Sequence, residues 1–495
     1  MDRRHFIALG AAGIGSAATL HWFRHRSLAQ ELTSTAAAPL YTSQNALLEV
    51  DLTAAVSPVQ VGDRTAKLLS YNGQSPGPRL EARPGDTVRI RLRNQLDQPT
   101  NLHYHGLHIT PQGTGDNVFV STAPGETFTY EFTIPADHPA GTFWYHPHHH
   151  HHAAVQLFGG LAGLFVIRGD LDEIPEVKAA QEEFIVLKDY EIDRAGNVPP
   201  ADHMALMMGR EGSLVTVNGQ LNPSLSIPQG GLLRLRLLNA SASRFYRLQL
   251  EGHPFQLIAT DGGAIASPVQ LQELLLAPGE RADVLVQGNQ TSGTYRLLNL
   301  PYNRNGIGMM GGMMGGGHGM GGMMHGGRGS SGDAQPLATL TYSGSVAALP
   351  LPRQLGTVET LPEPTVTRRI ELSMTMGHGM GQGMGMEFWF NGQPYDEKRI
   401  DIEAQLGTVE EWELANVDPD LMDHPFHLHV NPFQVVSRSG QPEPYRAWKD
   451  TVLVKGGETV RIRVPFRTFA GKTVYHCHIL DHEDLGMMGN LQISA

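Results

Sequence analysis

Apolar and polar residues alternate along short runs of this chain, and the pattern recurs three times. One such run is Asp86-Thr87-Val88-Arg89-Ile90-Arg91-Leu92, and comparable runs start at Leu232 and Thr408. Alternation with a period of two predicts half-buried β-strands. The turns that punctuate the three copies are Asn72-Gly73-Gln74, Asn218-Gly219-Gln220 and Asn391-Gly392-Gln393, followed later by Pro124-Gly125-Glu126, Pro278-Gly279-Glu280 and Gly456-Gly457-Glu458.

The repeat length indicates duplicated domains. A period of roughly 150 residues is too long for a solenoid unit. Strand-rich units of this size with regular turns are typical of Greek-key β-sandwiches. We therefore predict an all-β chain with three sandwich domains, over residues 45–170, 175–345 and 360–495.

Composition agrees with this organisation. A chain of 495 residues exceeds the usual size of one domain. Its 57 glycines and 32 prolines favour many short strands joined by turns. The formal net charge of -12 argues against nucleic acid or an anionic membrane as a partner. We expect a monomer.

The N-terminus predicts export. Residues 1–29 hold the twin arginines Arg3 and Arg4, a short apolar run, and the small-residue sequence Ser27-Leu28-Ala29. These features are typical of a cleaved twin-arginine (Tat) signal peptide, although an uncleaved anchor is the alternative. No later segment is apolar enough to span a membrane, so we expect a periplasmic or secreted chain without a membrane span in its mature form.

The candidate chemistry centres on the single cysteine. Cys477 lies between His476 and His478, with His482 and Met487 close behind. A thiolate, imidazoles and a thioether are the donors of blue-copper electron-transfer sites. If this segment is a strand, both flanking histidines point to the face opposite Cys477. One strand would then serve two metal sites, linked by covalent backbone.

Three further His-x-His pairs strengthen this interpretation. They are His103/His105, His146/His148 and His427/His429, and His424 precedes the last of them. The middle repeat has Gly293-Thr294-Tyr295-Arg296 where the others carry histidines. All predicted ligands therefore come from the first and third repeats, so we expect one metal cluster where these two domains meet, with the middle domain as a spacer.

These four segments resemble the copper signatures of the multicopper oxidases, a family that includes laccases, bilirubin oxidases and bacterial cuprous oxidases. The resemblance implies cupredoxin domains, four copper ions, and dioxygen reduced to water. It also implies a softer axial ligand, and a lower potential, than in laccases that have Leu or Phe in place of Met487. The implied ligands are His424, Cys477, His482 and Met487 for type 1 copper; His103 and His427 for type 2; His105, His146 and His478 for one type 3 copper; and His148, His429 and His476 for the other.

Dioxygen reduction also needs protons. The resemblance implies that Glu483, directly after His482, donates them and that Asp116 acts near the cluster. Asp420 and Asp423 precede His424, and either is a candidate to accept a hydrogen bond from its ring or to guide a cationic substrate.

Methionine is concentrated in two glycine-rich tracts. Thioethers suit Cu(I), so these tracts are candidates for collecting a cuprous substrate, and the alternative is a flexible linker. The first tract, within the insertion 308–327, contains Met309, Met310, Met313, Met314, Met320, Met323 and Met324; the second contains Met374, Met376, Met380, Met384 and Met386. The histidines at 149–152 extend the second His-x-His motif, and we expect them to be solvated rather than to bind stray metal.

We therefore expect an exported oxidase of Cu(I), of phenols or aromatic amines, or of both. The alternative within the family is a plain laccase or bilirubin-oxidase-like enzyme without a cuprous role. A non-catalytic protein of the same fold, such as a cell-division scaffold, would lack the copper ligands. Copper storage by the methionine tracts alone would leave the eight paired histidines unexplained.

Overall fold

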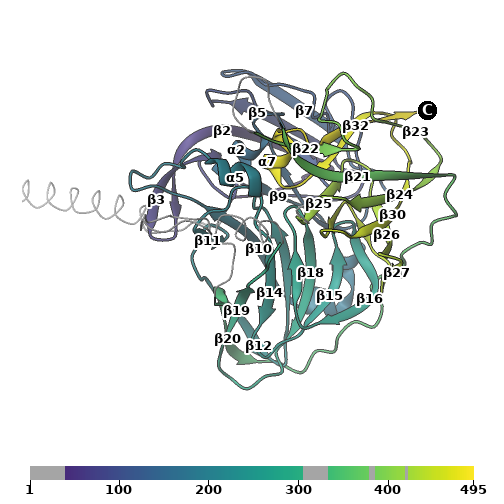
Figure 1. Ribbon diagram of the computed structural model, residues 1–495. Coiled ribbons are helices and arrows are strands. Elements are labelled where there is room, and N and C mark those ends of the chain that lie inside the picture. Colours follow the sequence, from purple (N-terminus) through teal and green to yellow (C-terminus); the bar gives the residue numbers. More distant parts are fainter. Residues whose placement is uncertain (1–38, 305–332, 378–384, 419–421) are drawn as a thin grey trace, which may run out of the picture. The chain divides into compact units, whose positions relative to one another are not determined.

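Paired β-sheets dominate the structure (Figure 1). The computed structural model describes residues 39–304, 333–377, 385–418 and 422–495. Its strands form six sheets, and three successive stretches of the chain supply two sheets each. The prediction of an all-β chain built from three sandwich-like units is confirmed. Among the described residues, no helix has the length and apolar character to cross a membrane.

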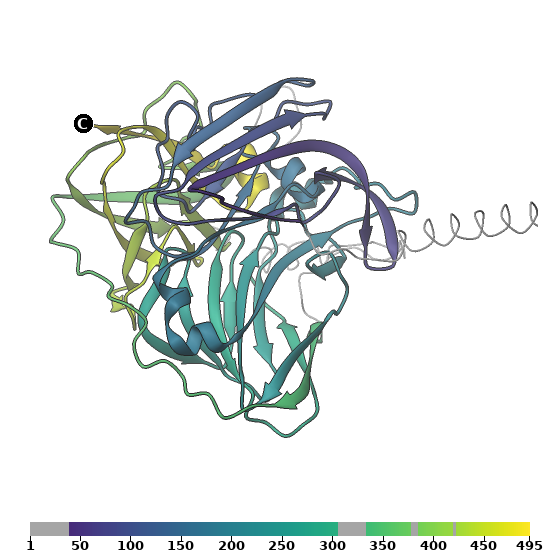
Figure 2. The same ribbon diagram turned by 180° about the vertical axis from the view of Figure 1, so that it is seen from behind.

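The first pair of sheets uses residues 40–167. One sheet has the order β1-β4-β9-β8-β6 and the other β3-β2-β5-β7. In the view from behind, β2 is the long curved purple strand (Figure 2). The strands are β1 Leu40–Thr42, β2 Leu47–Val61, β3 Arg64–Tyr71, β4 Arg79–Ala82, β5 Thr87–Asn94, β6 His103–His105, β7 Thr127–Thr133, β8 Gly141–His146 and β9 Gly163–Ile167.

The second pair uses residues 181–345, with the orders β11-β10-β13-β18-β15-β16 and β12-β20-β19-β14-β17. The predicted run at Leu232 lies in β13, which pairs with β18; the strand is buried along its whole length, so the prediction that it is half-buried is wrong. The strands are β10 Gln181–Tyr190, β11 Leu214–Val217, β12 Ser224–Gln229, β13 Leu232–Asn239, β14 Tyr246–Leu250, β15 Phe255–Thr260, β16 Gly263–Leu271, β17 Leu274–Leu276, β18 Arg281–Gln287, β19 Thr294–Leu300 and β20 Gln335–Ser345.

The third pair uses residues 366–494. One sheet runs β22-β21-β24-β30-β26-β27, with β28 beside β26, and the other runs β23-β32-β31-β25-β29. The strands are β21 Val366–Gly377, β22 Gly385–Phe390, β23 Ile402–Gln405, β24 Val409–Asn416, β25 His424–Leu428, β26 Phe433–Arg438, β27 Gln441–Pro442, β28 Trp448–Lys449, β29 Thr451–Val454, β30 Thr459–Pro465, β31 Gly471–Cys477 and β32 Met488–Ser494.

The three Asn-Gly-Gln turns are structurally equivalent. Asn72, Asn218 and Asn391 have φ values of 54°, 53° and 52°, and the glycine after each also has a positive φ. Asparagine and glycine tolerate this left-handed conformation, which suits a tight turn between strands. Each asparagine side chain also accepts a hydrogen bond from a backbone N–H of the adjoining strand. The repeat read from the sequence is therefore a repeat of local structure.

Short helices join the sheets. Two of them, α2 and α7, pack side by side and follow segments that carry predicted ligands (Figure 1). Each pair of sheets encloses its own buried apolar cluster. The described helices are α2 Ala153–Gly159, α3 Asp170–Glu173, α4 Pro175–Ala179, α5 His203–Met208 and α7 Leu480–Asp484.

Candidate metal centre

Two antiparallel strand pairs present the paired histidines. In the first pair of sheets β6 lies beside β8, with His103 opposite His146. In the third, β25 lies beside β31, with His427 opposite His476. Directly opposed residues in an antiparallel pair place their side chains on the same face. Each strand pair therefore offers imidazoles to one side of its sheet.

The strand β31 divides its side chains as alternation predicts. Cys477 lies opposite Phe426, on the face that also carries His424. His476 points to the other face, where it meets His148 and His429. His427 is three residues from His424 and therefore also lies on this second face. A single pair of strands thus borders two separate donor clusters.

The first cluster surrounds the cysteine. The Sγ atom of Cys477 lies 3.6 Å from Nδ1 of His424 and 3.8 Å from Nδ1 of His482. All three side chains are fully buried. The far ring nitrogen of His424 donates to Oδ2 of Asp418 at 3.1 Å, and that of His482 donates to the carbonyl of Met207 at 2.9 Å. Both Nδ1 atoms therefore turn a lone pair toward the sulfur.

This donor set fits a cation. Burial raises the pKa of the Cys477 thiol and lowers the pKa of His482 well below its usual range. A bound cation would reverse the first effect, because thiolates are stable in apolar surroundings when coordinated. The predicted axial residue, Met487, is buried in the same apolar cluster, and its carbonyl accepts a hydrogen bond from the Cys477 N–H at 3.0 Å.

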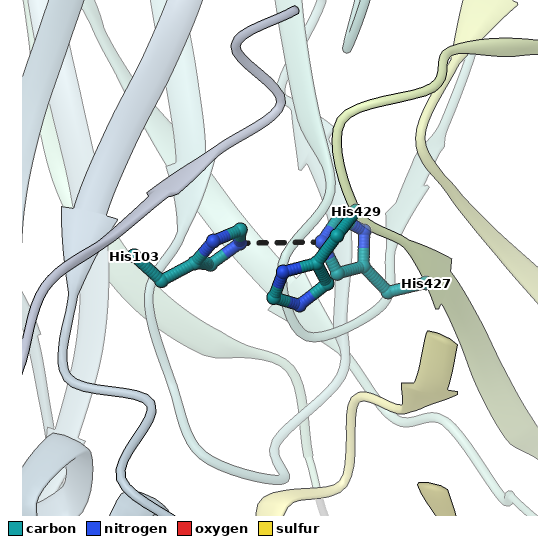
Figure 3. Close-up of side chains that lie close together, drawn as sticks. All are labelled: His103, His427 and His429. Carbon is teal, nitrogen blue, oxygen red and sulfur yellow. Dashed lines mark hydrogen bonds between the residues drawn. The ribbon is translucent and has the colours of Figure 1, made fainter. Parts of the chain in front are cut away.

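The second cluster joins the first and third pairs of sheets through buried imidazoles. Figure 3 shows His103 facing His427 and His429, with the Nε2 atoms of His103 and His427 3.4 Å apart. Nδ1 of His103 donates to Asp116 Oδ1 at 2.8 Å, and Nδ1 of His427 donates to the Asp450 carbonyl at 2.8 Å. A neutral imidazole has only one N–H, so two lone pairs face each other here. Such an arrangement suits a shared metal ion.

Within the same cluster, His148, His429 and His476 show the same geometry of facing ring nitrogens. Nε2 of His476 lies 3.1 Å from Nε2 of His148 and 3.0 Å from Nε2 of His429. The other nitrogen of His476 donates to the Cys477 carbonyl at 3.0 Å. Burial lowers the pKa of His148 to about 3 and the pKa of His429 well below its usual range, so these rings are neutral donors. The three predicted type 3 ligands of this set lie together.

The rings of the remaining predicted set, His105, His146 and His478, lie farther apart. The ring centroids of His105, His146 and His478 are 5.0–5.7 Å apart. Hydrogen bonds occupy Nε2 of His105 and Nδ1 of His146, while the other nitrogen of each ring is buried without a hydrogen-bond partner, as are both nitrogens of His478. One group whose ligand atoms lie within 4.8 Å of one another joins His105 and His146 to His103 rather than to His478. Orphaned buried nitrogens of this kind fit metal ligands.

Two carboxyl groups border the second cluster. Oε2 of Glu483 lies 3.1 Å from Nδ1 of His476, and Oε1 lies 3.5 Å from Nε2 of His148. Burial raises the pKa of Glu483 well above its usual range, and the neighbouring Asp484 adds to the rise. Asp116 accepts hydrogen bonds from the His103 ring and the Tyr104 N–H, and burial raises its pKa to about 8. Both predicted acids therefore lie against predicted ligands.

The hydrogen-bond acceptor of the His424 ring is not the predicted Asp423. Asp423 accepts instead from the Tyr302 hydroxyl at 2.6 Å and from the Gly456 N–H at 2.9 Å. Asp418, rather than Asp423, accepts the hydrogen bond from the His424 ring. Residue 420, the other candidate, lies outside the described residues, as do the predicted signal peptide 1–29 and the whole methionine tract 308–327.

The sequence also did not reveal Asp450 or Arg281. Asp450 accepts from Nε2 of His105 through Oδ1 and from His427 through its backbone carbonyl. Arg281, in the middle pair of sheets, binds both Asp450 oxygens, at 2.7 and 2.6 Å. The acid lies 345 residues from His105, and no spacing rule connects them.

The additional histidines at 149–152 are not part of a candidate metal group among the described residues. The ring of His149 lies 3.0 Å from the Ser121 hydroxyl, and the ring of His151 donates to the Asp484 carbonyl. His150 borders a cavity of about 80 Å³ that extends to His148. This cavity offers room for water beside one predicted ligand.

Comparison with known proteins places these features in a family. Three family models described as multicopper oxidase match residues 53–172, 182–311 and 367–495. The multicopper oxidase mco of Staphylococcus epidermidis is 30% identical over 433 residues, covering 86% of this chain and 84% of that protein. The cell division protein FtsP of Xenorhabdus nematophila is 29% identical over 440 residues, covering 88% and 86%. A solved multicopper oxidase from Campylobacter jejuni, described as a metallo-oxidase, superposes with a TM-score of 0.78 at 31% identity, covering 93% of this chain and 95% of that one.

Proposed function

The chain belongs to the multicopper oxidase family, and from that premise we propose an exported oxidase that couples one-electron oxidation of Cu(I), or of phenols and aromatic amines, to the four-electron reduction of dioxygen to water. The observation that carries the proposal is the buried strand pair β25/β31. It borders a cysteine cluster on one face and a histidine cluster on the other.

The proposal assigns four copper ions to these clusters. His424, Cys477, His482 and Met487 would hold type 1 copper, and the paired histidines would hold the three-copper cluster, in the sets that the family resemblance implies. When bound, copper would supply one-electron acceptance from substrate at the cysteine site and four-electron reduction of dioxygen at the histidine sites. We likewise propose the three domain ranges 45–170, 175–345 and 360–495, whose first and third members supply all ligands.

The chain's own residues link the two clusters. Cys477 is bonded through the backbone to His476 and His478, and the His476 ring donates to the Cys477 carbonyl at 3.0 Å. This gives electrons a short route of covalent and hydrogen bonds. Glu483 follows His482 and lies beside His476 and His148, so it holds a proton next to the cluster.

The relatives named as cell division proteins favour a second candidate, a non-catalytic scaffold of the same fold. The buried donors argue against it. A scaffold gains nothing from facing imidazole lone pairs or a cysteine enclosed by two histidines, and burying polar atoms without partners destabilises a fold. The complete set is therefore better explained by metal binding, and we propose the enzyme.

The proposal that Cu(I) is a substrate depends on the methionine tract. The seven methionines between 308 and 327 are soft donors suited to Cu(I) and have no evident role with a phenol. We propose that they deliver Cu(I) to the enzyme, in the periplasm or outside the cell after export by the N-terminal signal, and that the enzyme acts as a monomer.

The test compares two substrates in three proteins. The proteins are the wild type, a deletion of residues 308–327, and a full-length variant with serine at the seven methionines. Both variants should lose most Cu(I) oxidation while keeping oxidation of a bulky phenol, and the serine variant separates loss of thioethers from loss of chain length. Equal losses for both substrates at unchanged copper content would leave a plain laccase.

A further inference from the structure

The middle pair of sheets reaches the histidine cluster although it supplies none of the predicted ligands. The turn Gly279–Arg281, at the start of β18, lies against two of the predicted type 3 ligands. A Cβ atom placed on Gly279 would lie 2.9 Å from Cδ2 of His478 and 3.1 Å from Cε1 of His105. Gly279 also has a φ of 86°, which other residues rarely adopt. Only a glycine lets this turn approach the two rings so closely.

Arg281 connects this turn to the ligand His105. Its Nη1 and Nη2 atoms donate to the two oxygens of Asp450 at 2.7 and 2.6 Å. Asp450 Oδ1 in turn accepts from Nε2 of His105 at 2.9 Å. The guanidinium occupies both carboxylate oxygens in a planar fork, which fixes the direction in which Asp450 meets the ring.

Arg281 also donates to backbone carbonyls of its own turn and of two other segments. Its Nε donates to the Thr142 carbonyl at 3.0 Å, and further N–H groups reach the carbonyls of Gly279 at 3.2 Å and Asp261 at 2.9 Å. The guanidinium is fully buried, and all its nitrogens have acceptors. A lysine has three donors from one atom and cannot reproduce this fork.

A glycine in the first pair of sheets provides space for the contact between Arg281 and Asp450. Gly106 follows His105, and a Cβ atom there would lie 2.2 Å from Nη2 of Arg281 and 2.5 Å from Oδ2 of Asp450. The glycine of the His-Tyr-His-Gly motif is thus required by an arginine from another pair of sheets. Gly106, Arg281 and Asp450 come from the first, second and third pairs and meet at one point.

We infer that the turn Gly279–Arg281 is a positioning element for the copper cluster. Through Asp450 it holds His105 with Nε2 protonated, which leaves Nδ1 free as the donor atom, and through Gly279 it packs against His105 and His478. The middle domain is then more than the spacer that the sequence predicted. The inference rests on the proposed function, because it concerns ligands of the proposed cluster.

The test measures copper retention in three variants. Arg281→Lys keeps the charge but loses the fork, and Gly279→Ala adds the clashing Cβ. Arg234→Lys is the matched control, because Arg234 is another buried arginine of the middle sheets that pairs with Asp172 and Asp283 and not with a partner of a ligand. Each protein is loaded with copper and titrated with a chelator, while copper content, blue absorbance and the EPR signal of the cluster are recorded.

Loss of a hydrogen-bonding partner of a ligand typically lowers metal affinity about 10- to 100-fold. We expect Arg281→Lys and Gly279→Ala to release cluster copper with affinities lowered by about that factor and with an altered EPR signal, while the blue absorbance of the Cys477 site persists. The control should match the wild type. A positioning role predicts this selectivity, whereas general loosening of the interface does not.

Two outcomes would overturn the inference alone: cluster copper held as tightly as in the wild type, or blue absorbance lost in parallel with cluster copper. If Arg281→Lys does not fold, Gly279→Ala decides by the same criteria. A wild-type chain that takes up no copper would instead overturn the proposed function, and this inference with it.

Discussion

Replacing Glu483 by glutamine would remove the acid beside the histidine cluster while keeping its shape. The carboxyl group is fully buried, 3.1 Å from the His476 ring and 3.5 Å from the His148 ring. Burial raises its pKa well above its usual range, which favours the protonated form, and the positive charge of bound copper acts in the opposite direction. Glutamine cannot donate a proton as a carboxylic acid does.

The size of the effect follows from this position. A positioned general acid contributes about 10²- to 10⁴-fold to a rate. The cavity of about 80 Å³ beside His148 has room for water, which would replace part of the lost proton supply. We therefore expect oxygen reduction to slow by about 10²- to 10³-fold, or about 3–4 kcal/mol of activation free energy. One neutral polar group replaces another, so the unfolding free energy should change by about 1 kcal/mol or less.

Stopped-flow absorbance separates the two half-reactions. Anaerobic substrate should bleach the blue centre of Glu483→Gln at the wild-type rate, and reoxidation of the reduced enzyme by dioxygen should be slow. Asp484→Asn is the matched control, because the partly buried Asp484 carboxylate accepts from the Ala154 N–H rather than lying against a ligand ring. Slow bleaching with normal reoxidation would refute the reasoning and move Glu483 to the electron-entry side.

Three further predictions concern the metal sites. Met487→Leu should raise the potential of the blue centre without loss of copper, because losing an axial donor disfavours Cu(II), which takes more ligands than Cu(I). Redox titration of the blue absorbance checks this, and an unchanged or lower potential would exclude Met487 as the axial ligand. Asp418→Asn should weaken blue copper about 10-fold while cluster copper stays bound, because it removes the charge that His424 donates to; a chelator titration unchanged from wild type would count against this role. The copper-free chain should lose stability in acid. Burial lowers the pKa of His148 to about 3 in the folded chain, below the unfolded value of about 6.5. The contribution of this group to folding stability is therefore complete above pH 6.5 and declines toward pH 3, by at most about 1.4 kcal/mol per pH unit. Denaturant unfolding at pH 7.5 and pH 5 measures this, and equal free energies would contradict it.

Local periodicity predicted most of the fold. The alternating runs became strands, and the three Asn-Gly-Gln turns share one left-handed geometry, because such patterns depend on neighbours along the chain. The division of Cys477 from His476 across β31 followed from the same two-residue period. Features that depend on one strand were therefore accessible from sequence.

Features that depend on contacts between separate segments of the folded chain could not be predicted from the sequence. Asp418, rather than the nearer Asp423, bonds the His424 ring; Asp418 follows β24, which ends at Asn416, whereas His424 begins β25, so the periodicity of a single strand does not relate the two. Arg281 and Asp450 meet beside His105 only through packing of three separate pairs of sheets. Their signal in the sequence was a glycine, Gly106, whose necessity becomes visible only with the arginine in place.

The most direct test of the account is the copper content and visible spectrum of one copper-loaded sample of the purified chain, compared with Cys477→Ser. We predict four copper ions per wild-type chain and an intense blue colour from thiolate-to-copper charge transfer. The variant should be colourless and retain the three cluster coppers, because its histidines are untouched. A colourless wild type at full copper occupancy, or a blue colour that survives the loss of Cys477, would rule out a copper site built on this cysteine.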